Sequence, residues 1–195
     1  MKVLCLVERE GDGFADGSLR ALSFASSLAV ASGAGLVAVL FPDSGSGAAL
    51  DGEATVGQLA VLGATEACLV SATGLTGYAP AAWARALQQL AASGEACAVV
   101  AAATDRGSEV LAHLGAMAGL PVAANCVSAR PGSPGSWQLV RQRWAGSLLE
   151  DAVLEAPCAL LSVAADALPA PDASRVDSMV LLDSSQHEGC YLQLV

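Results

Sequence analysis

Short apolar runs alternate with helix-length segments along the first two thirds of the chain, and this rhythm restricts the possible folds more than any other feature. Five runs have the length of a strand, at 2–8, 35–41, 67–71, 97–103 and 121–128. They are apolar nearly throughout, which is typical of strands that are covered on both faces. Segments that fit helices lie between them, at 18–32, 50–62, 80–93 and 108–118. This order predicts an α/β fold with a parallel sheet between two layers of helices.

Two of the expected helices have recognisable starts. Ser18 precedes apolar residues at helical spacing, including Leu22, so we predict that it caps the first helix. Pro80 opens the helix that carries Trp83 and Leu87 on one face, and the first turn is a favourable place for proline.

After residue 130 the pattern changes to short strands separated by tight turns. A Pro/Gly/Ser cluster at 131–136 is followed by strand-length runs at 137–144, 147–154 and 157–163. We predict that these three strands form an antiparallel addition to the parallel sheet. Ala145 and Gly146 are expected in the first turn of that addition.

The remaining residues, 165–195, are predicted to form a linker and a tail. The linker contains Pro169 and Pro171, and the tail has a short apolar run within 175–183. The final residues show no periodicity. We therefore expect one domain over residues 1–164.

Composition and charge exclude several classes of function. The chain has 195 residues, of which 54% are hydrophobic and 14% charged, as expected for one folded core. Its net charge of −10 argues against nucleic acid or an anionic membrane as a partner, because both require basic patches. The apolar runs are too short for a membrane span or a signal peptide. We expect a cytoplasmic protein.

The reactive side chains do not form a recognisable catalytic or metal-binding pattern. Six cysteines are scattered without a CxxC pair, and we predict that they are free thiols acting as small core residues. The two histidines, His113 and His187, have no partner at metal-ligand or catalytic spacing. The glycine-containing loop 11–17 has two aspartates where a pyrophosphate would lie, so we interpret it as a flexible turn. We therefore expect no enzymatic activity.

The turn at 103–109 is the best candidate for a ligand site. Ligands of parallel sheets bind beyond the carboxyl ends of the strands, and this turn joins such an end to a helix start. The residues that would hold a phosphate or carboxylate are Thr104, Arg106, Gly107 and Ser108. The alternative is structural: Asp105 or Ser108 caps the helix, and Glu109 complements its dipole.

Arg141, Arg143 and Trp144 form one concentrated cationic and aromatic cluster in an acidic chain. On a strand, the two arginines would point to one face and Trp144 to the other. Arginine and tryptophan are enriched at protein interfaces, which makes these residues a candidate partner contact. The alternative is a solvent-facing edge strand protected by charge.

Four segments in order resemble the electron transfer flavoprotein alpha subunit, in its N-terminal domain. The first, 4–29, has a strand, a glycine-containing loop and a helix, and the second, 59–90, has Leu-Gly-Ala before a strand and Tyr78 before the next helix. The third, 102–120, has Ala-Thr and a glycine before a helix. The fourth consists of Arg141, Trp144, Ala145 and Gly146. The resemblance covers roughly residues 2–163. Positions that depart from the family pattern include Ser108, Asn125, Gln142 and Ser147.

The resemblance implies a fold similar to adenine-nucleotide alpha hydrolases, which is Rossmann-like and agrees with the strand and helix rhythm. In this family FAD is bound by a second domain, which the sequence given does not contain, and a beta subunit often carries AMP. We therefore expect no cofactor in this chain, and FAD in the complex. The expected partner is a beta-like subunit or a second copy of the chain.

These expectations favour a non-catalytic scaffold domain of a flavin-based electron-transfer complex. The first alternative is a stand-alone adenine-nucleotide-binding module of the same fold, acting as a sensor. The second is an enzyme of that fold, for which the sequence shows no chemistry.

Overall fold

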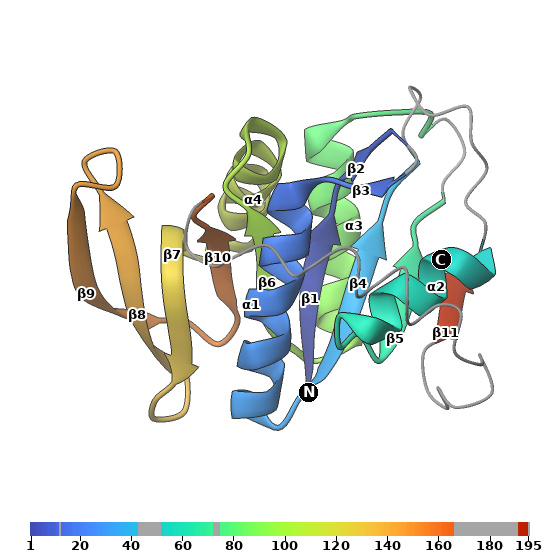
Figure 1. The fold of residues 1–195 in the computed structure, drawn as a ribbon. Helices are drawn as coiled ribbons and strands as arrows, with labels where there is room; N and C mark the ends of the chain where they lie inside the picture. The colour runs from blue at the N-terminus through green and yellow to red at the C-terminus, as the bar shows by residue number, and fades with distance from the viewer. Residues whose placement is uncertain (12, 43–51, 72–74, 166–190, 195) are drawn as a thin grey trace.

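A computed structural model describes residues 1–11, 13–42, 52–71, 75–165 and 191–194, and nine of its strands form one sheet (Figure 1). The order across the sheet is β11-β5-β4-β1-β6-β10-β7-β8-β9. These strands are β1 Lys2–Val7, β4 Gly35–Leu40, β5 Glu66–Leu69, β6 Ala96–Ala102, β7 Val122–Pro131, β8 Ser136–Arg143, β9 Leu148–Glu155, β10 Ala159–Val163 and β11 Tyr191–Leu194. Two further strands, β2 Arg9–Glu10 and β3 Gly13–Phe14, form a separate small hairpin.

Four helices cover the two faces of the sheet (Figure 1). They are α1 Asp16–Ser32, α2 Gly52–Val61, α3 Pro80–Ser93 and α4 Asp105–Ala118. Alternate residues of β1 enter different cores: Val3 packs with α1 and α2, while Leu4 packs with α3 and α4. Every β1 residue from Val3 to Val7 is buried, as its unbroken apolar run predicted. The expected three-layer α/β fold is confirmed.

The strand β10 occupies a different place from the predicted one. It pairs in parallel with both β6 and β7, so it belongs to the interior of the parallel sheet. The prediction that 157–163 is part of an antiparallel addition is therefore wrong. All five residues of β10 are buried, with Leu160 and Leu161 in opposite cores, and only an interior position covers a strand on both faces. The run at 157–163 is apolar nearly throughout, which already indicated a strand covered on both faces.

The strands β8 and β9 form the antiparallel part of the sheet. β8 pairs with β7 on one side and with β9 on the other, and β9 is the edge strand. Ala145 and Gly146 lie in the connecting turn, as predicted. Trp144 also lies in this turn, with φ of 51°, so it does not share a strand with the two arginines. β8 is not an edge strand, and the alternative of a charged edge does not apply to Arg141 and Arg143.

The helix starts differ in detail from the sequence expectations. α1 begins two residues earlier, with Ala15 at its N-cap, and Ser18 is buried instead. The Ser18 hydroxyl accepts a hydrogen bond of 2.8 Å from the Glu8 backbone N–H. α4 begins at Asp105 and is capped by Thr104, which is neither of the residues that we expected as a cap. Pro80 opens α3 as predicted.

The C-terminal residues include a strand that the sequence did not indicate. β11 runs parallel to β5 at the edge opposite the β8–β9 hairpin (Figure 1). Its four residues are too few to show a period. The predicted linker and the apolar run within 175–183 lie outside the described residues.

The described cysteines agree with the expectation that they are free thiols. The five described cysteines carry free thiols, and four of them are buried. None of the described helices is long and apolar enough to cross a membrane. Within the same residues, no three His, Cys, Asp or Glu side chains come together where they could hold a metal ion.

Replacing Leu161 by Ala should lower the free energy of unfolding by about 2 to 5 kcal/mol, because a fully buried side chain leaves a cavity in the sheet interior. Chemical denaturation of both proteins measures this difference. The matched control is Val153→Ala on the edge strand, which is 65% exposed and should change stability by about 0.5 kcal/mol or less. Equal costs at the two positions would contradict the interior placement of β10.

Candidate functional site

The order of the strands reverses between β1 and β6, at the centre of the sheet. From β1 the chain continues outward through β4 and β5 on one side, and it then returns to add β6 on the other side. In open α/β sheets, ligands bind beyond the carboxyl ends of the strands at such a reversal. Here those ends lead into Glu8 and into Thr104, so we call Glu8, Ser18, Tyr78 and residues 104–109 the switch-point site.

Thr104 joins the two strand ends. Its hydroxyl donates a hydrogen bond of 2.6 Å to Oε1 of Glu8. The same oxygen accepts a hydrogen bond of 2.9 Å from the backbone N–H of Gly107 and so caps α4. The backbone N–H of Ser108 bonds to the Thr104 carbonyl at 2.9 Å. Thr104 and the N–H groups of Gly107 and Ser108 are therefore already engaged inside the chain.

Gly107 is required by close packing at the start of α4. A Cβ atom at this position would overlap the carbonyl oxygen of Ala102 at the end of β6. Gly17 at the start of α1 also lies close, since its Cβ would sit 3.2 Å from the Ala102 side chain. The glycine in the predicted turn thus serves the packing of a helix against the sheet.

Tyr78 packs beside the first turn of α4, where it contacts Arg106 and Glu109. Its hydroxyl donates a hydrogen bond of 2.6 Å to Oε2 of Glu109. The guanidinium of Arg106 lies 4.9 Å from the centre of the Tyr78 ring, within the range of a cation–π contact. Burial and the neighbouring Glu109 carboxylate raise the pKa of the Tyr78 hydroxyl, so it remains a neutral donor.

The charge in the switch-point site is dominated by carboxylates. Burial raises the pKa of Glu8, and this effect is opposed by the Thr104 hydrogen bond and by the charge of Arg106. Glu109 adds a second carboxylate on the first turns of α4. A phosphate placed here would compete with Glu8 for the Thr104 hydroxyl and would lie close to two carboxylates. The described residues at this sheet edge therefore do not fit the pyrophosphate of FAD.

The structure brings the four predicted ligand residues together but gives them structural partners. Thr104, Arg106, Gly107 and Ser108 lie at the start of α4, and whether they contact a ligand stays a prediction. Sequence reasoning missed Glu8 as their neighbour. Its position directly after the first strand was a signal, because the carboxyl ends of β1 and β6 meet at one edge.

A cluster of two arginines and one glutamate lies on the β8–β9 hairpin. Two guanidiniums share the carboxylate of Glu150: Arg141 donates bonds of 3.2 and 2.7 Å to Oε2, and Nε of Arg143 lies 3.5 Å from it. The Arg141 hydrogen bond lowers the pKa of Glu150, with further contributions from the charges of both arginines. Two cations thus face one anion, which leaves a net positive charge.

The hairpin also exposes large apolar side chains. Trp144 is 81% exposed, and Leu148, Leu149 and Val153 are more than half exposed. Large apolar groups exposed together are typical of surfaces that contact a partner. The three residues predicted as a partner contact thus lie together on one hairpin, with Arg141 half-buried and Trp144 at its tip.

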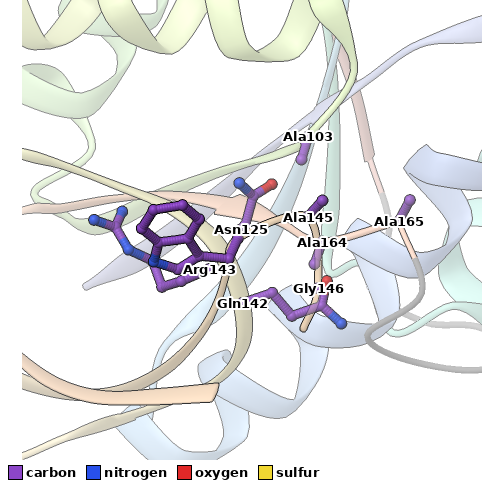
Figure 2. Close-up of a pocket in the computed structure, with 9 residues that line it drawn as sticks. Ala103, Asn125, Gln142, Arg143, Ala145, Gly146, Ala164 and Ala165 are labelled. Carbon is purple, nitrogen blue, oxygen red and sulfur yellow. The ribbon is translucent and has the colours of Figure 1, made fainter. Parts of the chain in front are cut away.

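A cavity of about 770 Å³ opens between this hairpin and the carboxyl ends of β6 and β10 (Figure 2). Asn125, Gln142, Arg143 and Trp144 contribute the larger side chains that line it. In Figure 2 the Asn125 amide lies between Arg143 on one side and Ala103 with Ala164 on the other.

The reversal of strand order, the two helix layers and the antiparallel hairpin define a doubly wound α/β domain of the Rossmann-like class. The family model for the electron transfer flavoprotein domain matches residues 3–183. The chain therefore belongs to the electron transfer flavoprotein domain family, and the predicted resemblance is confirmed at the level of the family. The match does not distinguish an alpha from a beta subunit. None of the curated proteins compared with the chain matches it.

The family consists of electron carriers that are associated with FAD and act in complexes. This identifies the kind of process in which the chain takes part.

Replacing Glu8 by Gln should stabilise the protein more at about pH 7 than at about pH 4. Because the pKa of Glu8 is raised on folding, stability is intact below its ordinary pKa and falls as the pH rises through the raised value. Gln does not ionise, and its carbonyl can still accept the Thr104 hydrogen bond. Arg106 and Tyr78, which face Glu8, are unchanged in the variant.

Denaturation of both proteins across this pH range measures the difference in free energy of unfolding. The control is Glu155→Gln at an exposed carboxylate of β9, which gives the effect of removing one surface charge. A difference between wild type and Glu8→Gln that stays constant with pH would contradict the burial of this carboxylate.

Proposed function

We propose that this chain is an alpha-type, non-catalytic scaffold domain of a flavin-based electron-transfer complex. The family match supports the process, and the quoted resemblance in four segments supports the alpha type. The observation that carries the scaffold role is the hydrogen bond between Thr104 and Glu8. The Thr104 hydroxyl donates to the chain's own Glu8 carboxylate, and the N–H groups of Gly107 and Ser108 bond to Thr104. A nucleotide phosphate at the helix start would compete with these internal bonds.

The β8–β9 hairpin is the proposed contact with the partner. It combines Arg141, Arg143 and Trp144 with the exposed Leu148 and Leu149. Exposed tryptophan and paired arginines are the residue types that contribute most to binding at interfaces. The hairpin stands at one end of the sheet, away from the switch-point site (Figure 1).

Membership of the family supports a proposal for the partner and the cofactor. The proposed partner is a beta-like subunit or a second copy of the chain, and that partner is the place for AMP. FAD is held in the complex by residues other than those at the switch-point site, because Glu8 and Glu109 do not fit a pyrophosphate. We propose a cytoplasmic complex, in keeping with the net charge of −10 and the short apolar runs.

Truncating Trp144 or Arg141 to Ala should weaken partner binding by about 2 kcal/mol or more, as at the centre of a protein interface. Calorimetry with the beta-type protein, and sedimentation for a second copy, measure the effect. The matched control is Val30→Ala on α1, because Val30 is apolar and 81% exposed like Trp144.

Folded Trp144→Ala and Arg141→Ala proteins that bind as tightly as wild type would remove the hairpin from the proposed function. A strictly monomeric protein that binds no beta-type subunit would remove the scaffold role itself.

The position of the switch-point site favours one alternative function. A helix start at the reversal of strand order is where nucleotides bind in this class of fold, which suits an adenine-nucleotide sensor. The carboxylate of Glu8 argues against it, since the charge of Arg106 is already opposed there by two acidic side chains.

Calorimetry with AMP and ATP separates the two functions. The scaffold proposal predicts no tight binding of either nucleotide to the wild-type chain, because a phosphate would have to displace Glu8 from Thr104. Micromolar or tighter binding of ATP that is lost in Thr104→Val would instead establish the sensor. Ser27→Ala on the exposed side of α1 serves as the control for loss of a hydroxyl.

A further inference from the structure

We propose that the cavity between the β8–β9 hairpin and the ends of β6 and β10 binds a small organic oxyanion with a flat ring. This cavity borders the switch-point site, since Ala103 lines it and directly precedes Thr104, and the proposal does not depend on the scaffold role. Its volume of about 770 Å³ lies within the range of small-molecule sites.

Backbone strain is concentrated around this cavity. Four described non-glycine residues have a positive φ, and three of them line it: Asn125 at 57°, Trp144 at 51° and Ala145 at 50°. Such a conformation is costly for a residue as bulky as tryptophan, and strained residues gather at functional sites. Three residues with a strained backbone therefore line the same cavity.

The charge of the lining selects an anion. The chain has ten more acidic than basic residues, yet the described residues that line the cavity include one arginine and no aspartate or glutamate. The partner of that arginine, Glu150, is shared with Arg141, which takes the shorter bonds at 2.7 and 3.2 Å. Arg143 is held at 3.5 Å and is half exposed, so its guanidinium has donors left for a ligand.

The neutral groups add hydrogen bonds and a flat surface. The side-chain amides of Asn125 and Gln142 both line the cavity, and each offers a donor and an acceptor. Trp144 is 81% exposed, so its indole face is open to a ring that stacks on it. Arg143 and the neighbouring indole of Trp144 thus recognise a flat ring that bears a carboxylate or a similar oxyanion, and Asn125 adds a neutral polar group from β7.

Nuclear magnetic resonance of the ¹⁵N-labelled chain tests the site with benzoate, and with benzamide as the uncharged probe of the same shape. The indole N–H of Trp144 and the amides of Asn125 and Gln142 report on the cavity. The other two indoles are internal controls, since Trp83 donates to Gly77 and Trp137 donates to Ala156 inside the fold.

We expect benzoate to shift the Trp144 indole signal, and benzamide to bind about tenfold more weakly because it lacks the charge. Arg143→Gln should weaken benzoate binding about tenfold as well. Arg85→Gln, which removes an exposed guanidinium on α3, should leave it unchanged. Unchanged Trp83 and Trp137 signals show that each variant is folded.

Three outcomes would overturn the proposal. The first is no shift of the Trp144 signal at tens of millimolar benzoate, and the second is equal binding of benzoate and benzamide. The third is shifts that reach Trp83 and Trp137 equally, which would show non-specific binding. A Trp144 signal that responds to a partner protein but not to benzoate would assign the cavity to the protein interface and also refute the small-molecule site.

Discussion

The hydrogen bond between the Thr104 hydroxyl and the Glu8 carboxylate joins the two strands at which the sheet reverses its order. It depends on Gly107, whose missing side chain lets the start of α4 approach the end of β6. In a fold of this class the same place would receive a phosphate. Because a carboxylate of the chain stands there, the fold keeps its architecture while the usual ligand position is filled from within.

The antiparallel hairpin gives the domain a surface of a different kind. Its inner face is fixed to the main core by Trp137 and Leu154, while its tip exposes Trp144. A binding surface requires a rigid supporting core and exposed aromatic or cationic side chains, and the hairpin has both. The centre of the sheet therefore carries internal hydrogen bonds, whereas the hairpin at one edge exposes apolar and cationic side chains.

The sequence predicted the layered fold because burial on both faces leaves an unbroken apolar run, as in β1 and β6. It misplaced β10, since nearness in sequence to the hairpin suggested pairing that the fully buried run did not support. It also missed the role of Glu8, which depends on a contact with Thr104 across 96 positions of the chain. The cavity could not be foreseen either, because the positive φ of Asn125 occurs where the β7–β10 register shifts, and that of Trp144 occurs in the hairpin turn.

Amide hydrogen exchange of the chain, alone and with its beta-type partner, tests the central claim most directly. The account predicts slower exchange on binding in residues 136–155, which form the β8–β9 hairpin, and no change in residues 104–109 at the switch-point site. Slower exchange at 104–109 in the presence of AMP or ATP, with the hairpin unaffected by any partner, would contradict it.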